Sequence, residues 1–159
     1  MSQLDPKEAE RLVDTYSDMI LRISWHYLRS AADADDICQN VFLKLLSGNY
    51  SFESPEHEKA WIIRTAINAC KDELRQARRN VVVLDESLKE AAEEPATGEV
   101  LDAVKRLPLK YREVIYLYYF ENYSAKEIAE LLGKSPEAVM KQLSRGRKKL
   151  RELLEDENG

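Results

Sequence analysis

Two helix-start signals flank a glycine in the C-terminal third of the chain. Ser124 precedes Glu127 by three residues, the spacing at which a hydroxyl and a carboxylate each satisfy a backbone N–H at a helix start. Gly133 follows the last apolar residue of that helix, where a left-handed cap favours a residue without a Cβ. Ser135 and Pro136 then supply an N-cap and a first helical residue. This order predicts two helices joined by a tight turn, a helix-turn-helix.

The second of these helices separates apolar from basic residues. Its apolar positions fall on one face of a 3.6-residue period: Val139, Leu143, Leu150 and Leu154. Residues 134–151 hold seven Lys or Arg and one acid, a local balance of +6 in a chain of formal charge −5. A solvated amphipathic helix at a domain end is the alternative interpretation. The double caps and the tight turn favour a helix that meets phosphate.

The rest of the pattern is also helical, and strand signals are almost absent. Cap and proline signals predict three helices before residue 80: from Asp5-Pro6 to about 28, from a cap at Asp33 to Gly48, and from Ser54-Pro55 to about 79. Apolar spacing predicts a short helix over residues 100–107 and another from Pro108.

The acidic residues are concentrated between the two halves. Residues 81–99 hold one Lys or Arg and six acids (−5), against −2 for residues 1–80 and +2 for residues 100–159. Residues 84–98 add Pro95 and Gly98 and contain little to bury. The sequence therefore predicts an all-α chain of two small helical domains, residues 1–80 and 100–159, joined by a flexible acidic linker over residues 81–99.

The third expected helix carries a basic stripe. Its members recur along one face: Arg64, Asn68, Lys71, Arg75 and Arg78, with Arg79 beside them. Trp61 lies one turn ahead, and Tyr50 and Phe52 occupy the preceding loop. Aromatic faces can stack unpaired bases while a basic stripe follows the phosphate backbone. Alternatively, Trp61 is a core anchor and Phe52 staples the helix start, and both interpretations can hold together.

The second expected helix begins with acidic residues and turns apolar one turn later. Asp33, Asp35 and Asp36 precede Ile37 and Phe42. Acids suit a helix N-terminus because of its partial positive charge, which by itself accounts for the pattern. A protein-binding face is the alternative.

Catalytic and metal chemistry find no support in the sequence. Cys38 and Cys70 lie inside helical patterns without a C-x-x-C spacing, and His26 and His57 are isolated. There is no phosphate loop and no nucleophile–base arrangement. We therefore expect no enzyme, no cofactor and no metal.

Nothing in the sequence predicts membrane insertion. No apolar run approaches the roughly 20 residues that a spanning helix needs. Residues 1–10 lack the basic and apolar parts of a signal peptide. The sequence therefore predicts a cytoplasmic protein.

Taken together, these motifs resemble the extracytoplasmic-function (ECF) sigma factors, the short two-domain members of the bacterial sigma-70 family. The second helix is similar to the family's core-binding pattern D-x-x-D-(I/V)-x-Q-x-x-F at Asp36, Ile37, Gln39 and Phe42. The third is similar to W-(L/I)-x-x-I-A-x-N-x-x-x-D-x-x-R at Trp61, Ile62, Ala66, Asn68, Asp72 and Arg75. The C-terminal patterns S-x-x-E-I-A-x-x-L-G and V-x-x-x-L-x-R-x-R-x-x-L also match, so that the resemblance covers nearly the whole chain.

The resemblance implies partners and promoter contacts. Core RNA polymerase is expected to bind, through the clamp helices of its largest subunit, at Asp35, Asp36, Ile37, Gln39 and Phe42. The flap of the second-largest subunit and an anti-sigma factor are further expected partners. Recognition of the minus-ten element, with a flipped base held by the 50–58 loop, is expected at Phe52, Trp61, Arg64, Asn68, Lys71, Arg75, Arg78 and Arg79. The minus-thirty-five element is expected to meet Ser135, Lys141, Gln142, Ser144, Arg145, Arg147 and Lys148.

The start of the last helix departs from the family pattern. Members often carry Gly-Thr-Val-Lys/Arg-Ser-Arg, whereas residues 137–142 of this chain read Glu-Ala-Val-Met-Lys-Gln. The preferred promoter sequence is therefore expected to be this chain's own. The main rival interpretation is a two-domain regulator that binds operator DNA without polymerase, which needs neither the 33–46 helix nor the 61–79 stripe.

Overall fold

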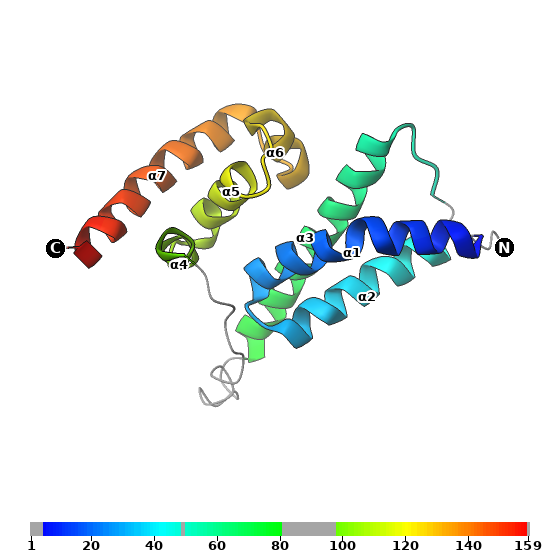
Figure 1. Cartoon of the computed structure of the whole chain (residues 1–159). Helices are drawn as coiled ribbons and strands as arrows, with labels where there is room; N and C mark the ends of the chain where they lie inside the picture. Colours follow the sequence, from blue (N-terminus) through cyan, green and yellow to red (C-terminus); the bar gives the residue numbers. More distant parts are fainter. Residues whose placement is uncertain (1–4, 49, 81–97, 159) are drawn as a thin grey trace. The chain divides into compact units, whose positions relative to one another are not determined.

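The structure, a computed structural model, describes residues 5–48, 50–80 and 98–158 of the 159-residue chain. These residues form seven helices and no strand (Figure 1), which confirms the predicted all-α class. The helices are α1 (Pro6–Leu28), α2 (Ala31–Ser47), α3 (Pro55–Asn80), α4 (Glu99–Lys105), α5 (Leu109–Tyr119), α6 (Ala125–Leu132) and α7 (Pro136–Asn158). The chain divides into two compact units, the first with α1 to α3 and the second with α4 to α7. The predicted linker lies outside the described residues as far as residue 97, and Glu99 already belongs to α4.

Side-chain caps start the helices of the first unit. The Asp5 carboxylate accepts a hydrogen bond from the Lys7 backbone N–H at 3.1 Å. The Ser30 hydroxyl accepts from the Asp33 backbone N–H at 3.2 Å, so α2 begins one residue after Ser30. The prediction that Asp33 caps this helix was therefore wrong by three residues. Asp33 lies in the first turn of α2, where a negative charge suits the helix N-terminus.

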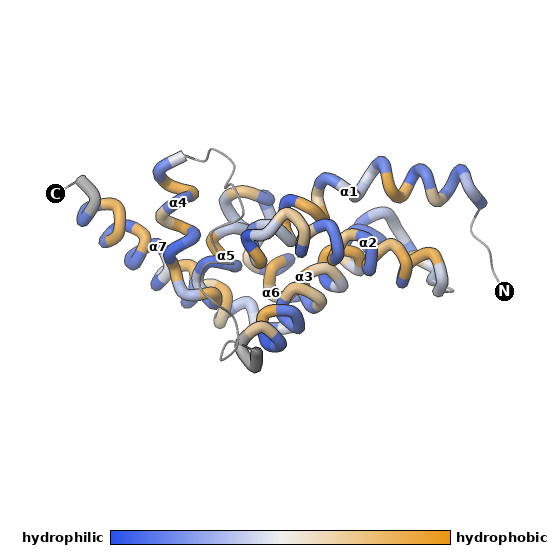
Figure 2. Tube along the Cα trace, turned by 90° about the horizontal axis from the view of Figure 1, so that it is seen from below, coloured by the Kyte–Doolittle hydropathy of each residue, from blue (hydrophilic) through white to orange (hydrophobic). Residues whose placement is uncertain are grey.

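The first unit has a core of branched aliphatic side chains. α1 lies along α2, and α3 packs against both (Figure 1). Hydrophobic and hydrophilic residues alternate along the helices, as one-sided burial requires (Figure 2). The core includes these fully buried residues: Ile20, Ile23, Val41, Ile62, Ile63 and Ile67. Val13 is 39% exposed because it lies one residue beyond buried Leu12, at the edge of the apolar stripe.

The helix-turn-helix of the second unit forms as predicted. The Ser124 hydroxyl accepts from the Glu127 backbone N–H at 3.1 Å, and the Glu127 carboxylate accepts from the Ser124 backbone N–H at 3.0 Å. Gly133 has a φ of 65°, the left-handed conformation that glycine adopts without strain. The Ser135 hydroxyl accepts from the Ala138 backbone N–H at 3.1 Å and so caps α7.

The apolar face of α7 packs against α5 and α6. Val139 and Leu143 are fully buried, whereas Leu150 and Leu154 are half-buried. Gly146 lies at a close approach of α7 to α5, because a Cβ at this position would be 3.0 Å from Cγ1 of Ile115. The absence of a side chain at Gly146 thus allows α7 to lie this close to α5.

Candidate functional site

An aromatic cluster of Tyr50, Phe52, His57 and Trp61 lies at the start of α3. The Trp61 ring centroid is 4.4 Å from that of Tyr50 and 5.8 Å from that of Phe52, and the Tyr50 and Phe52 rings are stacked. His57 meets the Phe52 ring edge-on at 5.5 Å, so it belongs to this aromatic cluster. Phe52 and Trp61 are half-buried and Tyr50 is exposed, so the cluster is both a packing unit and an accessible aromatic surface.

Hydrogen bonds and a close approach shape the loop before α3. The Ser54 hydroxyl accepts from the His57 backbone N–H at 3.1 Å, while His57 Nδ1 accepts from the Glu53 backbone N–H at 3.2 Å. His57 therefore acts much as a glutamate does in a capping box. A Cβ at Gly48 would lie 2.7 Å from Cδ2 and 2.8 Å from Cζ of Tyr50. Gly48 thus leaves room for the Tyr50 ring.

A partly buried polar contact ties the start of α3 to α1. Glu58 accepts hydrogen bonds from the Tyr16 hydroxyl at 2.7 Å and from the Arg11 guanidinium at 3.0 and 3.3 Å. Burial, followed by the bond to Glu58, raises the pKa of Tyr16 to about 12, so Tyr16 stays a neutral donor. This contact holds the first turn of α3, and with it the aromatic cluster, in place.

The basic stripe faces outward along α3. Arg64, Asn68 and Arg75 are exposed and Lys71 is half-buried, while the side chains of Arg78 and Arg79 lie outside the described residues. Arg75 forms an ion pair with Asp72 on the same helix, and both partners are exposed. Exposed pairs of this kind contribute little to stability. Arg75 can therefore exchange this partner for a phosphate at small cost.

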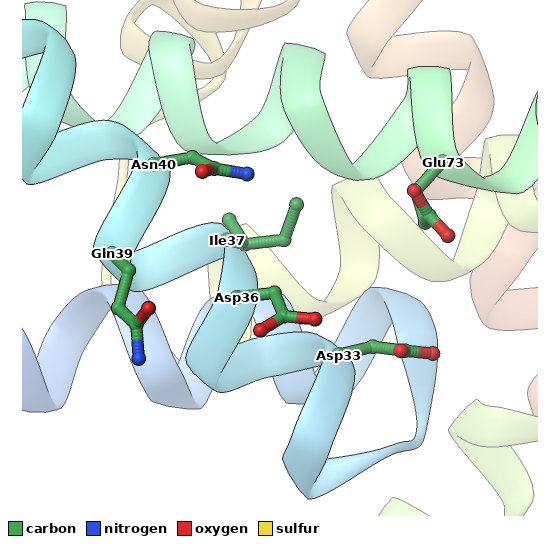
Figure 3. A pocket seen from close by; sticks show the side chains of 6 residues that line it. All are labelled: Asp33, Asp36, Ile37, Gln39, Asn40 and Glu73. Atoms are coloured by element: carbon green, nitrogen blue, oxygen red, sulfur yellow. The ribbon is translucent and has the colours of Figure 1, made fainter.

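The predicted polymerase-binding set divides into exposed and buried members. Asp35, Asp36 and Gln39 are exposed, whereas Ile37 and Phe42 are 5% and 8% exposed. The amphipathic period of α2 turns these two apolar residues toward the bundle. A hollow of about 200 Å³ on this face (Figure 3) is lined by Asp33, Asp36, Ile37, Gln39, Asn40 and Glu73. The exposed side chains around this hollow are therefore polar or acidic.

The predicted minus-thirty-five set also falls into two groups. Lys141, Ser144, Arg145 and Lys148 are exposed along α7. The other three make contacts within the unit: the Ser135 hydroxyl caps α7, Gln142 accepts from Lys134 at 3.1 Å, and Arg147 donates to the Tyr119 hydroxyl at 3.1 Å. The second group is thus fixed in position by the fold.

An apolar groove of about 400 Å³ was missed by sequence reasoning. It is lined by Val100, Val104, Ile115, Tyr119, Phe120, Arg147, Leu150, Arg151 and Leu154. Nearby on α5, Tyr118 and Tyr119 are 38% and 48% exposed. The apolar run continues past the end of α5 to Phe120, and this excess of apolar residues is the signal that could have revealed the groove.

Two family models match the chain. The model described as Sigma-70 region 2 matches residues 12–80, and that described as Sigma-70, region 4 matches residues 97–150. The RNA polymerase sigma factor SigZ of Bacillus subtilis (strain 168) is 31% identical over 152 residues, which cover 92% of this chain and 86% of SigZ. The chain belongs to the sigma-70 family.

A second relative indicates to which group of the sigma-70 family this chain belongs. The ECF RNA polymerase sigma factor SigW of Bacillus subtilis (strain 168) is 28% identical over 164 residues, covering 91% of this chain and 88% of SigW. This sigma factor is therefore of the ECF group, as its motifs implied. The sigma factor RpoE of Bartonella quintana, solved in complex with the anti-sigma factor NepR, has the same fold: the TM-score is 0.73 at 20% identity, with 94% of this chain and 98% of that chain covered.

Neither cysteine of the sigma factor is poised for chemistry. Burial raises the pKa of Cys38, and it raises the pKa of Cys70 to about 11, so both thiols stay protonated near neutral pH. Within the described residues, no three His, Cys, Asp or Glu side chains gather in a way that could hold a metal ion. The described helices also include none with the length and apolar character needed to cross a lipid bilayer.

Proposed function

We propose that this sigma factor binds core RNA polymerase in the cytoplasm and directs it to promoters with two DNA contacts, without catalysing a reaction itself. The observation that carries the proposal is a pair of outward basic helix faces, one on α3 and one on α7, each in its own compact unit. Each face alone offers a small footprint. Joining both to one polymerase raises the effective concentration of each at its element.

Core polymerase is proposed to bind both units. The exposed residues Asp35, Asp36 and Gln39 suit a basic partner surface on the clamp helices of the largest subunit, while Ile37 and Phe42 support that face from within. The groove beside α7 suits an apolar segment, for which we propose the flap of the second-largest subunit. An operator-binding regulator would need neither surface.

The minus-ten element is proposed to meet the first unit. The aromatic cluster offers ring faces to an unstacked base, and the stripe along α3 offers donors to the backbone. Asn68 is exposed between Arg64 and Lys71, where its amide can pair with a base edge. The proposed contacts are Phe52, Trp61, Arg64, Asn68, Lys71, Arg75, Arg78 and Arg79.

The minus-thirty-five element is proposed to receive α7 in its major groove. Lys141, Ser144 and Arg145 present their side chains to solvent for base contacts, and Lys148 suits a phosphate. Ser135, Gln142 and Arg147 complete the proposed set from positions held by the fold.

An anti-sigma factor is proposed to control this sigma factor. RpoE of Bartonella quintana was solved with the anti-sigma factor NepR, and its chain shares this fold. The acidic face of α2 and the apolar groove of the second unit would both be covered in such a complex. Covering them would keep the sigma factor from core polymerase.

Transcription in vitro tests the proposed function. Purified core polymerase from the source organism, mixed with this sigma factor and genomic DNA, is expected to produce transcripts whose mapped 5′ ends share two upstream elements. Core polymerase without the sigma factor is the control. Failure to form holoenzyme, together with DNA binding by the free protein, would favour the operator-binding regulator instead.

Arg145→Ala is expected to lower initiation at minus-thirty-five-dependent promoters by several-fold to about a hundredfold, because a bidentate base contact contributes about 1–3 kcal/mol. Initiation rates on the cognate promoter and on one with a scrambled minus-thirty-five element measure the effect. Arg145→Lys is the matched control, since it keeps the charge but not the planar fork. If Arg145 contacts phosphate only, Arg145→Lys will restore most of the rate; loss of core affinity in Arg145→Ala would indicate a structural role.

A further inference from the structure

A chain of polar contacts links α5, the turn before α7, and α7 itself. Glu113 on α5 is 2% exposed, and its Oε1 lies 3.4 Å from Nζ of Lys134, in the turn before α7. The same Nζ donates a hydrogen bond to Oε1 of Gln142 on α7 at 3.1 Å. Three parts of the second unit thus meet at one ammonium group.

The buried carboxylate holds that ammonium in place. The Glu113 side chain is 3% exposed and that of Lys134 is 25% exposed, so the pair is largely removed from water. An ion pair in such surroundings is costly to break from one side, because the remaining charge loses both its partner and its hydration. Lys134 is therefore held more firmly than a lysine on the surface.

The ammonium dictates which way the Gln142 amide faces. A lysine ammonium has three donors and no acceptor, whereas an amide has an acceptor oxygen and a donor nitrogen. Only the oxygen of Gln142 can face Lys134 favourably. The amide nitrogen must then point away, and no other described residue accepts a hydrogen bond from it.

Gln142 lies at the border of the outward face of α7. Leu143 beside it is 1% exposed, while Lys141 and Arg145 are exposed and Gln142 is half-buried. A side chain here can reach a base edge while its inner atom stays bound to the fold. Without Lys134, the amide could rotate by half a turn and offer either atom.

We infer that Lys134, held by Glu113, is a positioning residue that makes Gln142 present only hydrogen-bond donors to the minus-thirty-five element. This inference rests on the proposed function and specifies its base preference. In the major groove, guanine, adenine and thymine each offer an acceptor, while cytosine offers an N4 donor. The holoenzyme thus discriminates against cytosine at the one position that Gln142 contacts.

Holoenzyme transcription from a promoter library with a randomised minus-thirty-five element tests the inference. With the wild-type sigma factor, cytosine is expected to be disfavoured by about three- to tenfold at one position. Gln142→Glu keeps an acceptor toward Lys134 and replaces the outward donors by an acceptor, so the same position is expected to change its preference toward cytosine. The negative charge of this variant weakens all sequences alike and leaves the other positions of the profile unchanged.

Lys134 is tested by a pair of variants. Lys134→Met is expected to remove most of the bias against cytosine at that position. Lys134→Arg, whose side chain also only donates hydrogen bonds, is expected to keep the wild-type bias. A Lys134→Met variant that lowers initiation equally from every library member, with the base profile at that position unchanged, would overturn the inference in favour of a purely structural role. An unchanged base profile in Gln142→Glu would also overturn it. A wild-type profile without any minus-thirty-five dependence would instead contradict the proposed function itself.

Discussion

Gly146→Leu is expected to loosen the packing of α7 on α5 and to lower minus-thirty-five-dependent transcription. Glycine is unfavourable in a helix by about 1 kcal/mol relative to alanine, so adding a side chain gains some helix propensity. The Cβ of the new side chain would lie 3.0 Å from Ile115 and 3.3 Å from Cβ of Tyr111, and both neighbours are buried. Overpacking of this kind costs about 1–3 kcal/mol or more, so the loss exceeds the gain and we expect a net destabilisation of about 2 kcal/mol.

Hydrogen exchange of the full chain measures this effect by region. Protection of residues 98–158 is expected to fall and that of residues 5–80 to stay, with a melting temperature of the second unit lower by about 10 °C. Glu152→Leu is the matched control, because it places the same side chain at an exposed position of the same helix. Equal exchange in Gly146→Leu and the control would contradict the prediction, because it would show that α5 and α7 accommodate the larger side chain without losing stability.

Local signals explain why the helix-turn-helix could be predicted so closely. The Ser124 capping box, the left-handed Gly133 and the Ser135 cap each depend on residues within three or four positions, so a single sequence contains all the information. The same logic failed at α2, where Ser30 and Asp33 are both good caps three residues apart. Propensity ranks them nearly equal, and only the path of the chain from α1 decides between them.

For the candidate site, helical periodicity predicted which side chains face outward but not which residues they contact. The period placed Arg64, Asn68 and Arg145 on outward faces, and all three are exposed. It could not reveal partners that come from other elements. Arg147 meets the Tyr119 hydroxyl across 28 positions of sequence, and Lys134 meets Glu113 across 21. Such contacts depend on how the helices pack, so the orientation of the Gln142 amide could not be predicted from the sequence.

A glycine after a helix can be required for two different physical reasons, and Gly48 is an example. At the end of a helix, glycine predicts a left-handed cap. Gly48 instead has a φ of −95°, a conformation open to any residue. The requirement comes from the Tyr50 ring, which occupies the space that a Cβ would need. Glycine at this position therefore belongs to the aromatic cluster and not to the helix end.

Gly48→Ala is therefore expected to impair promoter melting without unfolding the protein. The added methyl group displaces the exposed Tyr50 ring, which can rotate into solvent at little cost in stability. Its stack with Phe52 and its tilted contact with Trp61 are then lost. Stacking of a base on an aromatic side chain contributes about 1–3 kcal/mol, so open-complex formation should fall at least several-fold. Permanganate reactivity of thymines in the minus-ten region measures the melted fraction, with holoenzyme formation followed in parallel.

A double-mutant cycle separates displacement of Tyr50 from a change in the backbone. Tyr50→Ala alone should reproduce the defect, and adding Gly48→Ala to Tyr50→Ala should cause no further loss, because the ring that the methyl group displaces is already gone. Gly98→Ala is the control, since a Cβ there meets no atom within 4 Å. A further loss in the double variant would mean that Gly48 acts through the chain path into α3. Normal melting in Tyr50→Ala would instead remove the aromatic cluster's exposed ring from the proposed minus-ten contact, leaving the adjacent basic stripe to hold the separated strand by charge alone.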